Sequence, residues 1–138
     1  MDRETRTLQD LRDRVAASPF HAELGIRTVE ATEGRVRLAI ETTESQKNLQ
    51  GTIHGGVLAT LADTAMGLAV RTAIEPGRPH ATIELTVHFV RPAAPGPIEA
   101  IGTVVRAGAQ IAFADADVTA PDGTLLARAS GTYSVATR

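Results

Sequence analysis

The chain has 138 residues, of which 43% are hydrophobic and 22% charged, values typical of one globular domain spanning residues 1–138. It contains no cysteine, which excludes disulfides, thiolate metal sites and cysteine nucleophiles. Fourteen Lys and Arg against sixteen Asp and Glu, with only three Phe and one Tyr, argue against nucleic acid as a partner.

The first residues, Met1–Arg6, alternate charges and lead into no apolar segment, so they match neither a signal peptide nor a transit peptide. The most apolar stretch, residues 57–70, contains Asp63 and is too short to cross a bilayer. We therefore expect a cytoplasmic protein without membrane association.

A short amphipathic helix is expected within residues 1–18, where apolar residues recur at helical spacing between residues 5 and 17, at Leu8, Leu11 and Val15. Ser18-Pro19 should end it. Two strands follow, at about residues 25–32 and 35–43, with a turn at Glu33-Gly34. Residues 44–53 are polar and predict a loop.

The longest expected element is a helix from about Gly55 to Ala73, followed by the helix-breaking pair Pro76-Gly77. Between residues 57 and 70 it is apolar on nearly every face. A helix of this kind is buried, either by a sheet or by a partner subunit.

After this helix the apolar period changes to two, which predicts strands. The alternation puts one set of side chains on one face and a second set on the other: Ile83, Leu85, Val87 and Phe89 against Thr82, Glu84, Thr86 and His88. Three more strands are expected, at about residues 97–107, 110–120 and 124–136, with turns at Ala107-Gly108 and Pro121-Asp122-Gly123. The element order predicts an α+β fold in which one antiparallel sheet covers one long helix.

Asp63 is the only charge in the apolar part of the long helix. A carboxylate there is costly to bury without a partner. It either makes a structural hydrogen bond or ion pair, or takes part in chemistry, and its position alone favours neither.

His54-Gly55-Gly56 precedes the helix, where unpaired backbone N–H groups carry partial positive charge. Glycine lets a ligand approach these N–H groups closely, so they can donate to a carbonyl oxygen that becomes an oxyanion. A simple turn before a helix is the alternative interpretation.

Gly55 and Asp63 are eight residues apart, which separates them by about 12 Å along one helix. Both groups cannot act on one carbon within one chain. If both act on one carbonyl, they come from two antiparallel copies of the helix at a two-fold dimer interface.

The pattern Asn48-x5-His54-Gly55-Gly56-x6-Asp63, with a later strand ending Phe89-Val90-Arg91-Pro92, resembles the hotdog-fold acyl-CoA thioesterases, most of all the phenylacetyl-CoA type of phenylacetic acid degradation. The resemblance covers roughly residues 19–136. It implies the hotdog fold, in which an antiparallel sheet wraps around one long central helix at residues 55–73. It also implies hydrolysis of an acyl-CoA without a cofactor, and dimers that often pair into tetramers.

The resemblance further implies a role for each motif residue. The Gly55 N–H would polarise the thioester carbonyl, and Asp63 of the facing subunit would act as nucleophile or as general base on water. Asn48 would position the water or the carbonyl. His54 would orient the loop or support the thioester, and Thr82 lies where the family often has a Ser or Thr that holds the water.

Two further positions are expected to contact substrate. Gly56 neighbours the predicted oxyanion donor, and Arg91 could meet the coenzyme A phosphates. Arg106 and Arg128 are the other basic candidates, although solvent exposure is the simpler explanation for any single arginine.

Other activities fit the sequence less well. The possible ligands His54, His80, His88, Asp63 and Glu84 lack metal-site spacing, so we expect no metal. No G-x-S-x-G or nucleotide-binding motif is present. A non-catalytic acyl-CoA-binding module on the same fold is the main alternative, and a hotdog dehydratase that uses His54 is a weaker one. The preferred acyl group would be aryl, arylacetyl or short to medium.

Overall fold

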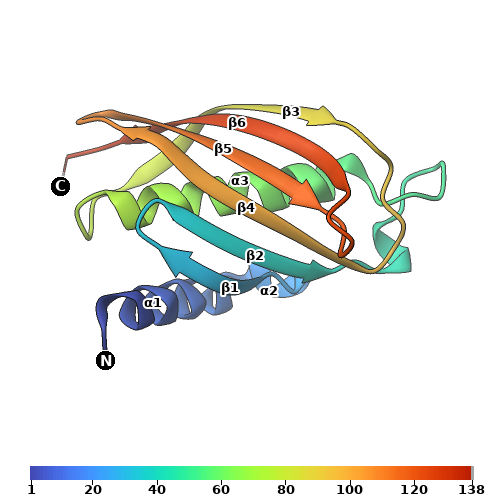
Figure 1. The fold of residues 1–138 in the computed structure, drawn as a ribbon, viewed down its shortest axis with the longest axis horizontal. Coiled ribbons are helices and arrows are strands. Elements are labelled where there is room, and N and C mark those ends of the chain that lie inside the picture. The colour runs from blue at the N-terminus through green and yellow to red at the C-terminus, as the bar shows by residue number, and fades with distance from the viewer. Residues whose placement is uncertain (138) are drawn as a thin grey trace.

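The computed structural model describes residues 1–137. Six antiparallel strands form one sheet in the order β1-β2-β4-β5-β6-β3, and the sheet curves around the long helix α3 (Figure 1). The elements are α1 (Arg3–Ala17), α2 (Pro19–Leu24), β1 (Arg27–Thr32), β2 (Arg35–Glu41), η1 (Glu44–Gln46), α3 (Gly55–Ala73), β3 (His80–Phe89), β4 (Pro97–Ala107), β5 (Ile111–Thr119) and β6 (Leu125–Val135). This arrangement confirms the expected α+β hotdog fold.

The N-terminal segment contains one helix more than expected. Helix α1 ends at Ala17, as predicted, with Asp2 accepting from the Thr5 N–H at its start. Pro19, which we interpreted only as a stop, is the first residue of α2, and Ser18 caps that helix. Proline is favourable at a first helical position because its missing N–H would have no partner there. Strand β1 consequently begins at Arg27 instead of about residue 25.

The strand and turn predictions agree with the structure to within a few residues. Gly34, at φ 81°, forms the turn between β1 and β2, and Gly123, at φ 87°, forms the one between β5 and β6. These left-handed conformations favour glycine. The predicted loop at residues 44–53 contains the short 3₁₀ helix η1.

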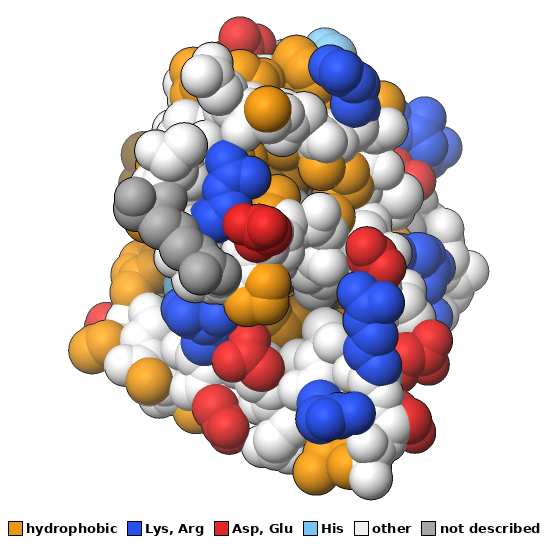
Figure 2. Space-filling model, turned by 90° about the vertical axis from the view of Figure 1, so that its left-hand side faces the viewer, with side chains coloured by type: hydrophobic (Ala, Val, Ile, Leu, Met, Phe, Trp, Pro, Cys, Tyr) orange, Lys and Arg blue, Asp and Glu red, His pale blue; other side chains and the backbone are white. Residues whose placement is uncertain are grey.

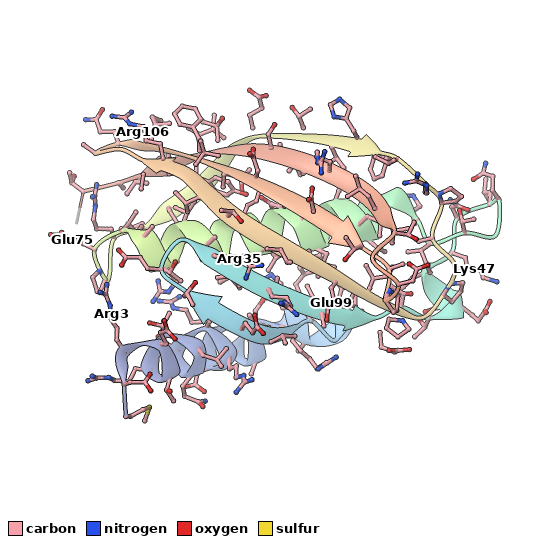
Figure 3. The ribbon with its side chains drawn as sticks, viewed as in Figure 1. Arg3, Arg35, Lys47, Glu75, Glu99 and Arg106 are labelled. Atoms are coloured by element: carbon pink, nitrogen blue, oxygen red, sulfur yellow. The ribbon has the colours of Figure 1, made fainter. Side chains whose placement is uncertain are left out.

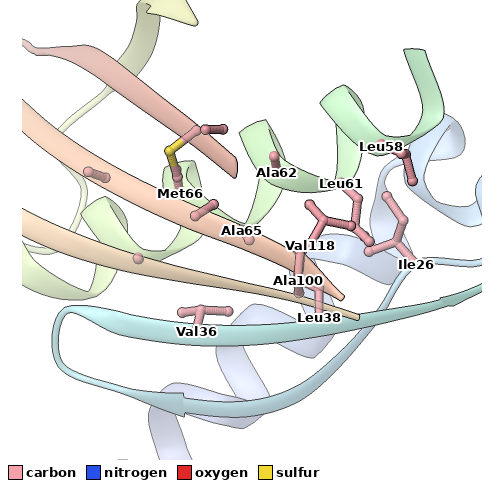
Figure 4. Packing of buried hydrophobic residues seen from close by; sticks show 14 of the residues in the cluster. Ile26, Val36, Leu38, Leu58, Leu61, Ala62, Ala65, Met66, Ala100 and Val118 are labelled. Carbon is pink, nitrogen blue, oxygen red and sulfur yellow. The ribbon is translucent and has the colours of Figure 1, made fainter. Parts of the chain in front are cut away.

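Helix α3 spans the predicted residues and packs one side against the concave face of the sheet (Figure 4). The buried residues of α3 are Leu58, Leu61, Ala62, Ala65, Met66, Ala69 and Val70. The approach to β4 is close, since a Cβ on Gly102 would lie 2.4 Å from the backbone carbonyl of Ala65. The opposite side, which includes Thr60, Thr64 and Gly67, is only half-buried. Within one chain the sheet buries one side of α3, and burial of the other side by a partner subunit remains a prediction.

Charged side chains of both signs are mixed at the end of the molecule that carries the two termini (Figure 2). Arg3 and Glu75 lie at this end (Figure 3). Arg71 of α3 and Asp10 of α1 form an ion pair at 3.3 Å, which joins the two helices. Within residues 1–137, no helix has the length and apolar character needed to cross a membrane.

Candidate active site

Asp63 lies on α3, and two hydroxyl groups hold its carboxylate. Thr82 Oγ1 donates to Asp63 Oδ1 at 2.8 Å, and the Tyr133 hydroxyl donates to the same oxygen at 2.9 Å. Within residues 1–137 no donor lies on Asp63 Oδ2. One carboxylate oxygen is therefore anchored, and the other is available to accept a proton or to attack a carbon.

Tyr133 is a site residue that the sequence analysis missed. Its side chain is buried, at 1% exposure, on the helix-facing side of β6. Burial, followed by the negative charge of Asp63, raises the pKa of the Tyr133 hydroxyl above its ordinary value of 10.0, so the group stays a donor near neutral pH. A signal was available, because a buried tyrosine needs a hydrogen-bond partner and this is the only tyrosine in the chain.

Thr82 reaches Asp63 because β3 is irregular at Ile83. Thr82 pairs with Tyr133 of β6 but Glu84 pairs with Thr132, so one residue of β3 is extra. Such a bulge reverses the alternation of faces. The prediction that Thr82 shares a face with Glu84, Thr86 and His88 is therefore wrong.

Beyond the bulge, β3 keeps the predicted alternation. Glu84 and His88 point away from α3, and His88 borders a depression of about 720 Å3 on the outer face of the sheet. Glu84 and His88 thus lie on the opposite face of the sheet from Asp63.

The start of α3 presents one backbone N–H without a partner. His54 caps the helix, and its Nδ1 accepts from the Gly56 N–H at 2.8 Å. The Val57 N–H donates to the His54 carbonyl, whereas the Gly55 N–H has no acceptor within residues 1–137. Gly55 therefore supplies the free donor of this segment.

The hydrogen bond between His54 and Gly56 also determines which of their polar groups can contact a ligand. Because His54 Nδ1 accepts, a neutral His54 carries its proton on Nε2. Its side chain is exposed, so this N–H can reach a ligand. The predicted substrate contact at Gly56 cannot use the backbone N–H while the cap is intact.

Asn48 organises the loop before α3. Its Oδ1 accepts from the N–H groups of Gln50 and Thr52 at 3.0 and 3.1 Å, and its Nδ2 donates to Thr52 Oγ1 at 3.0 Å. The amide nitrogen carries two hydrogens, so one N–H remains for water or a carbonyl. Leu49, at the tip of this loop, is fully exposed.

The three candidate arginines lie in different surroundings. Arg91 follows β3 and donates to the Leu125 carbonyl at 3.1 Å, which leaves other guanidinium donors available. Arg128 forms a two-bond pair with Asp117, at 2.8 and 3.2 Å, on the outer face of the sheet. Arg106 lies at the end of the molecule opposite Lys47, the residue before Asn48 (Figure 3). Of the three, Arg91 is placed best for contact with a ligand at the start of α3.

A single chain holds the site as two separate halves. The free N–H of Gly55 is at the first turn of α3, and the Asp63 carboxylate is about 12 Å further along the same helix. Within residues 1–137, no three His, Asp or Glu side chains come together in a group that could hold a metal ion.

Comparison with known proteins assigns the family. The sequence profile of the thioesterase superfamily matches residues 50–127, more than half of the chain. The chain belongs to the thioesterase superfamily. This thioesterase is 31% identical over 121 residues to human acyl-coenzyme A thioesterase 13, with 83% of this chain and 86% of the human protein covered.

Two further relatives are similar to this thioesterase. A Halobacterium salinarum protein, named as a candidate esterase, is 42% identical over 106 residues, covering 73% of this chain and 70% of the relative. A solved mutant structure of the phenylacetic acid degradation protein PaaI of Thermus thermophilus superposes with a TM-score of 0.78 at 30% identity, covering 85% of this chain and 98% of that one. Family membership and these relatives identify the chain as a thioester hydrolase.

Proposed function

We propose that this thioesterase hydrolyses acyl-CoA thioesters, and that each active site combines Gly55 of one subunit with Asp63 of a second. The observation that carries the proposal is that α3 presents two unused groups: the Gly55 N–H, which has no acceptor within residues 1–137, and the Asp63 carboxylate, which is held through one oxygen only. Such a pair supplies an oxyanion donor and a base or nucleophile. The acyl-CoA substrate is proposed by analogy with the human relative.

The chemistry needs only these two groups and water. In the general-base route, Asp63 removes a proton from water as the water oxygen attacks the thioester carbon. The carbonyl oxygen becomes negative and accepts a hydrogen bond from the Gly55 N–H. The C–S bond then breaks, and the proton passes from Asp63 to the departing thiolate.

A covalent route uses the same groups. Asp63 Oδ2 attacks the thioester carbon directly and expels the thiolate, which leaves a mixed anhydride. Water hydrolyses the anhydride, restores the carboxylate and releases the free acid, and the proton freed in this step balances the thiolate expelled in the first. Thr82 and Asn48 are suited to hold the water in either route, because each carries a hydroxyl or amide group near one half of the site.

A second copy is expected to cover the exposed side of α3 and β3. Strand β3 is an edge strand, and its apolar side chains Ile83 and Phe89 are 57% and 55% exposed. Exposed apolar groups along an unpaired edge favour association. Two antiparallel copies of α3 would bring each Gly55 to the partner's Asp63, and pairing of such dimers into a tetramer remains a prediction.

An arylacetyl group is the proposed acyl preference, with short to medium acyl groups next. The similarity to the Thermus thermophilus protein supports this order. The exposed Phe89 ring beside Gly55 also supports it, because aromatic rings pack favourably against one another.

The experiment is a thiol-release assay with phenylacetyl-, benzoyl-, hexanoyl- and palmitoyl-CoA. We expect turnover by the wild-type protein and a loss of about 10²–10⁴-fold in D63N with the fold retained. D13N is the matched control, since Asp13 lies on the exposed side of α1, and it should keep full activity. Near-wild-type turnover by D63N would contradict the catalytic assignment, and a preference for palmitoyl-CoA would contradict the acyl assignment.

A further inference from the structure

We propose that Tyr133 is a positioning residue for Asp63: its hydroxyl sets the rotamer in which Oδ2 is free to react. This inference rests on the proposed function, because it assigns Asp63 the reacting carboxylate. The Tyr133 hydroxyl oxygen lies 2.9 Å from Asp63 Oδ1 and 3.2 Å from the Asp63 carbonyl oxygen. One hydroxyl thus contacts both the side chain and the backbone of the same residue.

Two glycines fix the position of the Tyr133 ring. A Cβ on Gly131, two residues earlier in β6, would lie 2.8 Å from ring atom Cε2 and 3.1 Å from the hydroxyl oxygen. A Cβ on Gly67 of α3 would lie 3.6 Å from Cε1 on the other edge of the ring. The ring therefore fills the space that these glycines leave between sheet and helix, and its hydroxyl has little freedom to move.

The hydrogen bonds hold the Asp63 carboxylate in one orientation. Both hydroxyl donors, from Thr82 and Tyr133, converge on Oδ1, so rotation of the carboxylate would break two hydrogen bonds. Thr82 lies exposed on an edge strand, whereas Tyr133 is buried behind α3. Tyr133 is thus the more firmly fixed of the two donors in the single chain, before any second subunit covers β3.

The test is Y133F, which removes the hydroxyl and keeps the ring between Gly67 and Gly131. We expect kcat to fall about 10- to 100-fold with KM within twofold, because a reacting group displaced by about 1 Å costs a factor of this size. A crystal structure of Y133F should show Asp63 in a second rotamer or in several.

The control is T42V, which also deletes a buried hydroxyl with hydrogen bonds. Thr42 Oγ1 donates to the Gly96 carbonyl at 2.7 Å and accepts from the Gly96 N–H at 2.9 Å, and neither residue contacts Asp63. T42V should lower the melting temperature and leave kcat unchanged. A structural role alone for Tyr133 would make Y133F behave like T42V.

Restoring a donor provides the second arm. p-Aminophenylalanine at position 133 places an N–H where the hydroxyl was, and should recover most of the kcat that Y133F loses. The proposal is wrong if Y133F keeps kcat within twofold, or if Asp63 keeps its single rotamer in Y133F. The Asp63 rotamer is observed in a crystal structure and needs no turnover, so it tests the role of Tyr133 independently of the substrate. If no acyl-CoA in the panel is hydrolysed, that result overturns the proposed function and not the positioning role.

Discussion

The ring of Phe89 occupies the space in which a side chain on residue 55 would begin. A Cβ on Gly55 would lie 3.0 Å from Phe89 Cε1 and 3.2 Å from Cζ. Gly55 is not among the positive-φ glycines, so its backbone conformation does not require glycine. The close approach of the ring favours glycine instead, because any side chain at residue 55 would make the ring shift. The absent side chain at residue 55, which we expected to admit a ligand, also makes room for an aromatic neighbour.

Deleting the Gly55 N–H should abolish most activity. Proline is favourable at the first position of a helix, and the His54 ψ of 133° suits a residue that precedes proline. G55P should therefore keep α3 while lowering kcat about 10²–10³-fold, the usual effect of losing an oxyanion donor. The measurement is kcat on the fastest acyl-CoA substrate, with circular dichroism to verify the helix.

The control for G55P is G55A, which adds a Cβ and keeps the N–H. Its Cβ requires the exposed Phe89 ring to shift by a few tenths of an ångström, so we expect a loss of less than about tenfold. Equal losses in G55A and G55P would mean that the ring contact, and not the N–H, accounts for the effect.

A site shared between subunits predicts complementation between two inactive variants. A mixed dimer of D63N and G55P contains one site with both the Gly55 N–H and the Asp63 carboxylate. After subunit exchange at equal concentrations, activity should rise to about a quarter of the wild-type value, since half of the dimers are mixed and each has one intact site. Mixing D63N with the double variant G55P/D63N creates no intact site and should give no recovery. A lack of recovery in the first mixture would contradict a site shared between Gly55 of one subunit and Asp63 of another.

Substitution by alanine should change the free energy of unfolding by different amounts at Gly102 and at Gly67. In G102A the new Cβ would lie 2.4 Å from the Ala65 carbonyl carbon and oxygen, so α3 must move away from β4. We expect a decrease of at least about 1–3 kcal/mol in the free energy of unfolding.

G67A is the matched substitution, because its Cβ makes an ordinary 3.6 Å contact with the Tyr133 ring. It should be neutral, or stabilising by up to about 1 kcal/mol, since alanine is the better helix former. Both values come from urea unfolding at one protein concentration. A G102A variant as stable as wild type would mean that the sheet and helix are less tightly packed than we describe.

The sequence predicted those elements whose limits are set by neighbouring residues. The bounds of α3 were correct because His54-Gly55-Gly56 precedes the apolar run and the helix-breaking pair Pro76-Gly77 follows it. The β1–β2 hairpin was correct because its turn contains Gly34. Helix α2 was missed because the same two residues, Ser18-Pro19, both end α1 and begin α2.

Contacts between distant segments could not be predicted in the same way. Asp63 and Tyr133 are 70 residues apart, and no local pattern links a helix position to a position on the last strand. The orientation of Thr82 depends on one extra residue at Ile83, which the alternation of apolar and polar residues does not reveal. The candidates Asp63 and Gly55 came from the sequence, whereas the hydroxyl that holds Asp63 came from the structure.

His80 predicts a specific loss of stability in acid. It is the first residue of β3 and is half-buried. Burial, followed by the positive charge of Arg71 and a smaller effect of Arg14, lowers the pKa of His80 below 6.5, although a hydrogen bond to the Gly67 backbone opposes this shift. The folded state therefore binds a proton less readily than the unfolded state. This contribution to stability is complete above about pH 6.5 and is lost as the pH falls through the lowered pKa.

The measurement is the free energy of unfolding from urea titrations between pH 7.5 and 4.5. H80Q should reduce the decrease of this free energy in acid. H88Q, which changes a histidine on the exposed outer face, is the control and should leave the pH dependence unchanged. Equal slopes for wild type and H80Q would show that other groups cause the acid sensitivity.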